Sequence, residues 1–273
     1  MTFDTNRYES SVGDVLRAGL EAAADELYVV NPDLDTLEQL LDVLDTDPGP
    51  TVKLLAAESV LKAMSRDFKL ASVAADLRDA DRLVLHIYEG TDNTLLVDET
   101  SAVAVIAAGG RVAGLVADDE AFVEGAHEAY ADAFEGGESF GLRTPGITAV
   151  RETLADALGS EVADDFDGVL ASMETARGDD DDLDEVTVSL LVAAKNEELL
   201  YDISKWGEDV GIASKATFSR TKSELEEAGL LDTEKVPIDV GRPRLRLKLA
   251  DDRLQDASPA ELASVAGSML ARN

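Results

Sequence analysis

Cysteine is missing altogether from this chain of 273 residues. Its absence excludes disulfide bonds, thiolate catalysis and zinc sites built on cysteine. The sequence also has no apolar run of about 18 residues and no apolar segment typical of a secretion signal. We therefore expect a cytoplasmic protein without membrane contact.

Basic residues are scarce, with 24 Lys and Arg against 57 Asp and Glu and a formal net charge of -33. Only nine of the basic residues are Lys. An acid surplus of this size ordinarily argues against binding to nucleic acid. Because the acids are spread over nearly every segment, we interpret the composition as that of a halophilic protein adapted to molar salt.

The acid surplus is interrupted at residues 199–249. This segment contains nine basic and nine acidic residues, so the other 222 residues carry the whole charge of -33. The local neutrality indicates a site for an anionic partner. Since phosphate contacts weaken as salt rises, recognition in molar salt has to depend on base edges and DNA shape.

Two helices are predicted at the start of this segment. Residues 199–210 place apolar side chains at helical spacing, and Gly211 ends the first helix. Ser214 is a residue type that caps a helix start, and Phe218 and Leu225 give the second helix a buried side. A helix, a turn and a capped helix predict a helix-turn-helix.

The outer side of the second helix carries small polar side chains and cations. Such a face fits the DNA major groove, because Arg forms two hydrogen bonds with guanine and Ser bonds several bases. At about 100° per residue, Ala216, Ser219, Arg220 and Ser223 point away from the core. The candidate DNA contacts are Lys215, Ala216, Thr217, Ser219, Arg220, Lys222 and Ser223, with Lys215 and Lys222 at the border, where phosphates would lie.

A basic hairpin is predicted next, with the strand-like runs VPIDV and RLRLKL around GRPR. In the second run, leucines and cations alternate and therefore face opposite ways. Residues 242–248 hold four cations and no acid. A basic tip and a basic outer face suit a phosphate backbone. The candidate phosphate contacts are Arg242, Arg244, Arg246 and Lys248.

Two other interpretations stay open for a chain with these features. A winged helix can bind protein, and solvated Arg on an edge strand also prevents aggregation. The chain would then be a ligand-binding or protein-docking module, with Ala216, Ser219, Arg220 and Ser223 covered by the C-terminal helix. An enzyme in the front half, anchored to DNA, would need a deep polar pocket at His86.

Residues 1–145 are predicted to form an α/β or α+β domain that senses an effector or dimerises. Helices are expected near residues 12–27, 34–44 and 59–80, and strands at TVKLLAAE and LVLHIY. TLLVDE, AVAVIAA and RVAGLVA are three further β-like runs. A helix at 119–134 closes the domain, with one side formed by Phe122, Ala126, Ala129, Tyr130 and Ala133.

The remaining chain is divided into a connector, a winged domain and a last helix. Residues 146–185 are expected to form a helical connector that ends in the acidic run GDDDDLDE, which favours a solvated linker over a metal site. Residues 186–252 form the winged helix-turn-helix domain. Residues 253–273 form a C-terminal helix that begins with a capping box at Ser258, and its apolar stripe is buried on its own domain or in a dimer.

Two stretches of the chain resemble known regulators. From Leu83 to Phe140, LLVDE, a following strand, GLVADDEAF and a helix resemble the effector domains of sugar-responsive archaeal regulators, which are similar to half of a phospholipase D. The acidic α/β front and the GRPRLRLKL wing together resemble the TrmB-suppressor (TbsP) family of haloarchaeal transcription regulators. This resemblance implies a sequence-specific DNA-binding transcription regulator of central carbon metabolism, including sugar and gluconeogenic genes.

Catalysis is not expected. Phospholipase D enzymes need a His and a Lys two residues apart and a downstream Asp, whereas His86 is followed by Ile87 and Tyr88. His127 lies among acids and is interpreted as a surface residue. No glycine-rich phosphate loop is present. We therefore expect no catalytic residue, no metal and no cofactor, but a homodimer that binds double-stranded DNA and can respond to a small-molecule effector.

Overall fold

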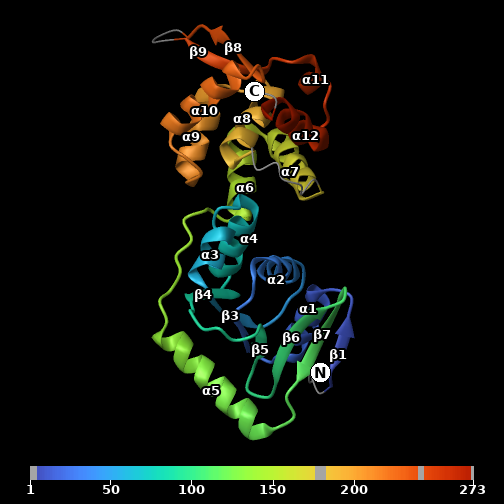
Figure 1. Cartoon of the computed structure of the whole chain (residues 1–273). Helices are drawn as coiled ribbons and strands as arrows, with labels where there is room; N and C mark the ends of the chain where they lie inside the picture. The colour runs from blue at the N-terminus through green and yellow to red at the C-terminus, as the bar shows by residue number, and fades with distance from the viewer. Residues whose placement is uncertain (1–4, 176–182, 239–242, 272–273) are drawn as a thin grey trace. The chain divides into compact units, whose positions relative to one another are not determined.

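The computed structural model describes residues 5–175, 183–238 and 243–271 (Figure 1). The chain divides into two compact units, Met1–Gly146 and Ile147–Asn273. Each unit has its own core and is described by itself.

A seven-stranded mixed sheet forms the centre of the first unit. The strand order is β1-β7-β6-β5-β2-β3-β4, in which β2, β3 and β4 run parallel and all other neighbours are antiparallel. This confirms the mixed α/β class, whereas the expected likeness to half of a phospholipase D stays a prediction. The strands are β1 (Arg7–Glu9), β2 (Glu26–Val30), β3 (Thr51–Ala56), β4 (Leu83–Ile87), β5 (Leu95–Val97), β6 (Ala102–Ala108) and β7 (Arg111–Val116).

Helices cover both faces of this sheet. Figure 1 shows α1 (Val12–Ala22) and α2 (Leu34–Thr46) on one side and α5 (Glu120–Gly136) on the other. Alternation along β5 explains the two cores: Leu96 packs against α1 at Gly19, whereas Val97 joins the cluster beneath α5.

The helix expected over residues 59–80 is two helices, α3 (Glu58–Met64) and α4 (Phe68–Asp79). The break occurs where the Asp67 side chain accepts a hydrogen bond from the Leu70 amide, which caps the start of α4. A helix cap satisfies amide groups that a continuous helix would use for its own hydrogen bonds. The apolar periodicity therefore predicted helix correctly but missed the boundary.

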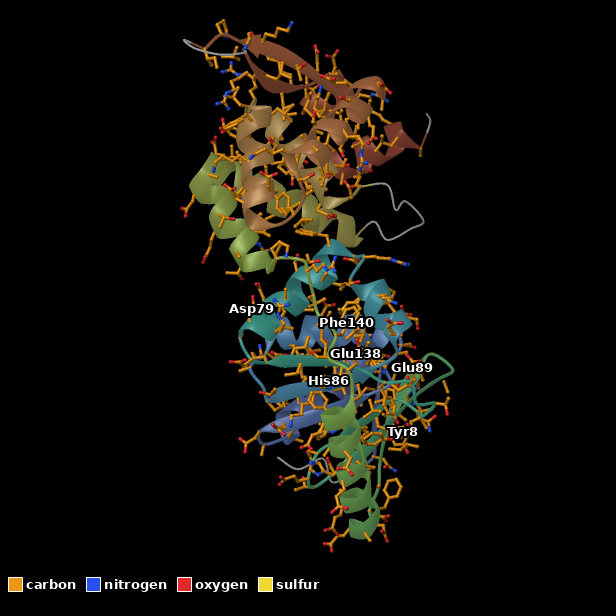
Figure 2. The ribbon with its side chains drawn as sticks, turned by 90° about the vertical axis from the view of Figure 1, so that its left-hand side faces the viewer. Tyr8, Asp79, His86, Glu89, Glu138 and Phe140 are labelled. Carbon is orange, nitrogen blue, oxygen red and sulfur yellow. The ribbon has the colours of Figure 1, made fainter. Side chains whose placement is uncertain are left out.

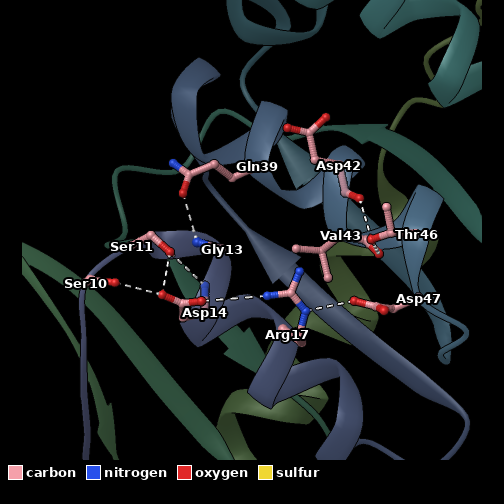
Figure 3. Close-up of polar contacts among 10 residues, drawn as sticks. All are labelled: Ser10, Ser11, Gly13, Asp14, Arg17, Gln39, Asp42, Val43, Thr46 and Asp47. Carbon is pink, nitrogen blue, oxygen red and sulfur yellow. Dashed lines mark hydrogen bonds and ion pairs between the residues drawn. The ribbon is translucent and has the colours of Figure 1, made fainter.

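Polar contacts tie α1 to α2 (Figure 3). The Gly13 amide at the start of α1 donates to Gln39 Oε1 over 2.9 Å. One turn on, Arg17 Nε donates to Asp47 Oδ2 over 2.8 Å, and its guanidinium also lies 3.7 Å from Asp14. Because these ion pairs are about 40% exposed, they add little to the stability of the fold. Their main effect is to orient α1 relative to α2.

The free edge of β4 is covered by the chain that returns from α5. The Ile87 amide donates to Glu138 O and the Phe140 amide donates to Leu85 O, both over 2.8 Å. Figure 2 labels His86 together with Glu138 and Phe140 of the returning chain. His86 stacks on Phe134 with ring centroids 3.9 Å apart, and its Nδ1 lies 2.7 Å from Phe134 O. The His86 ring is therefore occupied by packing and by a backbone contact.

The second unit is built around α8 (Glu185–Lys195), whose residues from Val186 to Ala194 are all buried. The helices before it are α6 (Ile147–Leu158) and α7 (Ser160–Thr175), and after it come α9 (Leu200–Val210) and α10 (Lys215–Glu227). The unit ends with β8 (Leu231–Val236), β9 (Arg244–Leu249), α11 (Asp252–Gln255) and α12 (Pro259–Leu270).

The expected connector helices belong to the second unit. The indole Nε1 of Trp206 on α9 donates to Thr153 Oγ1 on α6 over 3.0 Å, and its ring meets Phe166 of α7 edge-on. Most of the acidic run lies outside the described residues. Thus α6 and α7 pack against the helix-turn-helix and extend its core.

The last helix, α12, is buried on its own unit. It packs on α7, where a Cβ at Gly168 would come within 2.8 Å of Pro259. The predicted capping box is present, with the Ser258 amide donating to Glu261 Oε2 over 3.0 Å. Within the unit, Leu262 and Met269 of the apolar stripe are buried, and Val265 and Leu270 are half-buried. Within the described residues, no helix is both long enough and apolar enough to cross a membrane.

Candidate nucleic-acid interface

The helix-turn-helix is formed by α9 and α10. Gly211 adopts a left-handed conformation with φ 92°, and the Ile212 amide donates to Gly207 O over 2.8 Å. Only a residue without a Cβ takes this φ readily, which explains why the first helix ends here. Ser214 then accepts a hydrogen bond from the Thr217 amide and starts α10, as its sequence position predicted.

The outer face of α10 is open. Ala216, Ser219 and Arg220 are exposed, and Thr217 and Ser223 are half-buried. The opposite side is closed by Phe218 and Leu225, which are buried. The side chains expected to face outward therefore do so, and α12 packs on α7 instead of covering them.

Arg220 is the cation that projects furthest from this face, with 72% of its side chain exposed. Its Nε lies 3.8 Å from Glu224 Oε1, one turn along the helix. An ion pair this long and this exposed contributes little stability. The Arg220 guanidinium can therefore leave Glu224 and turn toward a DNA groove with little loss of stability.

Lys222 is placed differently from the expectation. It is 9% exposed, and its Nζ donates to Glu226 Oε2 over 2.7 Å. Glu226 is held on its other side by the Thr233 hydroxyl from β8, at 3.0 Å. Lys222 therefore pairs within α10, where Glu226 makes the contact to the wing, and does not lie at the border where phosphates were expected.

Lys215 lies at the start of α10 and pairs with α9. Its Nζ donates to Glu208 Oε2 over 2.6 Å, and both side chains are more than 40% exposed. The hydrogen bond raises the pKa of Lys215 and lowers the pKa of Glu208, so both groups are charged. The Lys215 ammonium is thus already paired with an acid of the protein.

The wing is the antiparallel hairpin of β8 and β9, paired from Leu231↔Leu249 to Val236↔Arg244. The expected first strand, VPIDV, is wrong at its described residues: β8 runs through LDTEKV and ends at Val236, and Pro237 and Ile238 are not in a strand. The last two residues of the run lie outside the described residues. Pro237 supplies no amide hydrogen, which explains why pairing ends there. The alternation predicted for β9 holds at Leu247 and Leu249, which are buried, whereas Leu245 is half-buried like the cations.

The cations of β9 are half-buried, and two of them already have partners. Arg244 stacks over the Tyr201 ring at 3.4 Å from its centroid, and Lys248 Nζ lies 2.8 Å from Glu234 Oε2. Arg246 interacts electrostatically with Glu198. Burial and, secondarily, Asp202 raise the pKa of Glu198, and Arg246 offsets only part of this rise. The Arg246 Nε is buried without a hydrogen-bond partner. Arg242, the fourth predicted cation, lies outside the described residues.

No sequence pattern indicated the residues that hold these cations. Glu208 and Glu234 lie on neighbouring elements, seven and fourteen positions from their partners Lys215 and Lys248. Acids are so frequent in this chain that spacing alone does not identify a pair. The role of Tyr201 was equally unpredictable from the sequence, because its contact with Arg244 depends on how α9 packs against the wing.

Neither histidine lies in a catalytic arrangement. His86 contacts Phe134, and the cavity of about 1050 Å³ in the first unit is lined by other residues. His127 is half-buried, and its ring meets Tyr28 edge-on with ring centroids 5.6 Å apart. Within the described part of the chain, no group of three potential metal ligands occurs.

Comparison with solved structures gives a distant match. TrmBL2, an archaeal chromatin protein whose structure shows a novel mode of DNA binding, is 14% identical over 51% of this chain and 55% of its own, with a TM-score of 0.37. The chain thus spans about half the length of that protein. At this level the likeness supports no conclusion about fold or function. No curated protein matches the chain.

Two family models cover almost the whole sequence. Residues 4–145 match the description "Transcriptional regulator TbsP-like, N-terminal", and residues 146–267 match "Transcriptional regulator TbsP-like, C-terminal HTH domain". The second match contains α9 and α10, where the structure has its helix-turn-helix. The family expected from the sequence is therefore confirmed, and the chain belongs to the TbsP-like transcriptional regulators.

Proposed function

We propose that this chain is a sequence-specific regulator that binds double-stranded DNA with α10 in the major groove and the β8–β9 wing on the backbone. The observation that carries the proposal is the open outer face of α10, where Arg220 stands among small polar side chains. A helix with this face fits the groove, and Arg220 has the geometry to bond guanine O6 and N7 together.

The wing has a different part in the proposal. Arg244 and Lys248 carry positive charge at the hairpin but are engaged by Tyr201 and Glu234. Contact with phosphates requires these cations to exchange an internal partner for DNA. The wing therefore adds affinity without reading sequence, and it adds less than free cations would.

We further propose that two copies act together and that the first unit senses an effector or dimerises. Two recognition helices related by a two-fold axis reach half-sites about one helical turn apart. The resemblance to the TbsP family implies target genes in central carbon metabolism, and the composition supports work in molar salt. We expect the chain to act by binding and not by catalysis.

The test is to substitute Arg220 by Ala and measure binding to the chain's own operator and to random duplex. The operator is first obtained by mapping genomic occupancy at native salt, with and without a change of carbon source. Arg220→Ala is expected to weaken operator binding by about tenfold or more and to leave random-duplex binding within about twofold.

Arg151→Ala is the matched control, because Arg151 is a half-exposed arginine on α6 that pairs with Asp167 at 2.6 Å. The control is expected to bind both duplexes like the unmodified chain. An equal loss on operator and random duplex for Arg220→Ala would contradict base reading by α10. Unchanged binding to both would mean that Arg220 does not contact DNA and would contradict the proposed placement of α10 in the major groove.

A further inference from the structure

A cavity of about 1050 Å³ lies in the first unit between α5 and the sheet. Its strand wall includes Leu95, Ala104 and Leu115, and its helix wall includes Phe122, Gly125 and Ala129. α5 buries only Val123 and Phe134 among its described residues, so most of its sheet-facing side borders this space. A space of this size and lining is typical of a ligand site.

Charge is almost absent from the cavity wall. Of its sixteen lining residues, Asp92 is the one carboxylate, and none is basic. In the whole chain, 30% of residues are charged. An anionic ligand would therefore meet an acid and no counter-charge, which excludes phosphates and carboxylates as good ligands.

The position of Asp92 is fixed by neighbours on both sides. Asn31 ends β2 in a left-handed conformation with φ 46°, and its Nδ2 donates to Asp92 O. The Thr94 hydroxyl donates to Asn31 O over 3.0 Å, which holds the same loop. The Tyr88 hydroxyl donates to Asp92 Oδ2. A pre-positioned carboxylate loses little freedom when a ligand binds.

Aromatic rings surround this carboxylate. Tyr88 and Tyr130 meet edge-on with centroids 6.3 Å apart, and Phe122 lines the cavity while 60% exposed. Burial, and secondarily Asp92, raises the pKa of both tyrosines, so their hydroxyls stay neutral. Aromatic faces beside one carboxylate attract organic cations.

We infer that this cavity binds a small molecule with a protonated amine on an apolar body. The amine lies against the Asp92 carboxylate and the aromatic rings, and the body fills the apolar space between α5 and β5, β6 and β7. This inference rests on the proposed sensing role of the first unit and names the chemistry that the unit senses.

The test uses tryptamine, tryptophol and indole-3-acetate, which share an indole body and differ in a cationic, neutral or anionic head. Titration calorimetry on the full chain without DNA is expected to show tryptamine binding at least about tenfold tighter than indole-3-acetate. Asp92→Asn keeps the acceptor for Tyr88 but removes the charge. Tryptamine is then expected to bind Asp92→Asn no better than tryptophol.

Gly125→Leu fills the cavity from the helix side, where a Cβ meets nothing within 4 Å, and is expected to abolish tryptamine binding. Gly136→Leu is the matched control on the same helix, with equally open space and no place in the cavity wall, and it is expected to bind like the unmodified chain.

Three results would overturn the inference: no binding of any probe, equal affinity for all three heads, or tryptamine binding that survives Gly125→Leu. Operator binding by the unliganded chain is measured in parallel. If the unliganded chain does not bind the operator, the proposed function is contradicted, whereas the calorimetric result still stands. The two failures are therefore distinguishable.

Discussion

Single side chains decide what the second unit presents to a partner. Helical periodicity predicted that Ser219 and Arg220 face outward, because every residue of a helix turns by about the same angle. It failed at Lys222, whose side chain turns inward to Glu226, one turn away and held by β8. Whether a side chain faces outward follows from the geometry of its own helix. Its partner, in contrast, depends on an element that comes later in the chain.

Gly207 gives a prediction at the same scale. A Cβ at this residue of α9 would collide with the ring of Phe218, which is fully buried in α10. We expect Gly207→Ala to lower the free energy of unfolding by about 1–3 kcal/mol, because the packed ring has no room to move. Urea unfolding followed by fluorescence measures it, since Trp206, the one tryptophan, is 3% exposed beside it.

Gly267→Ala is the control for that measurement. It makes the same change in a helix of the same unit, where a Cβ meets nothing within 4 Å. It is expected to stabilise the unit by about 0.5–1 kcal/mol, as replacing Gly by Ala in a helix usually does. Equal effects of the two substitutions would mean that the contact between Gly207 and Phe218 is not tight.

Neighbouring elements of the winged module neutralise each other. Lys215 of α10 pairs with Glu208 of α9, and Lys248 of β9 pairs with Glu234 of β8. The strand and helix types were predictable from alternation and capping, but these pairs were not. When DNA replaces an internal acid, that acid takes up a cation from solution, which offsets part of the counterion release that drives binding.

Removing one such acid is expected to strengthen binding and to increase its salt dependence. Glu208→Gln frees Lys215, so DNA affinity at low salt should rise by up to about fivefold. The slope of log K against log salt should become more negative by up to about one, because no cation is taken up. Fluorescence anisotropy over a salt series measures both quantities.

Glu58→Gln in α3 provides the comparison, since Glu58 pairs with Lys62 at 2.8 Å and similar exposure but lies in the first unit. It is expected to change neither affinity nor slope. If Glu208→Gln leaves the slope unchanged, Lys215 does not contact phosphate.

At the scale of the whole molecule, the net charge was evident from the composition. The strand order of the sheet, in contrast, was not contained in any local pattern. In the sheet, β1 pairs with β7, with Arg7 opposite Gly114, although these residues are separated by most of the first unit. β5 joins β2 antiparallel, beside the parallel trio. Pairings of this kind depend on long-range packing, whereas hydrophobic periodicity reports only each element's own faces.

Salt is expected to stabilise the folded chain. In the compact state, the acidic groups behind the net charge of -33 repel one another. Salt shortens the range of this repulsion from about 10 Å at 0.1 M to about 3 Å at 1 M. The thermal unfolding midpoint should therefore rise as KCl increases, which circular dichroism can follow. Sorbitol at equal osmolality should give a smaller rise, and equal rises would assign the effect to solute exclusion instead of charge screening.

The covering of β4 by residues 138–140 has a consequence for how molecules meet in a crowded solution. An uncovered strand invites another chain to add to it, which is a common start of aggregation. Here one border of the sheet is closed by its own chain, and the other is the three-residue β1, with charged residues at both ends. Strand addition to the seven-stranded sheet is thus limited to a short, charged border.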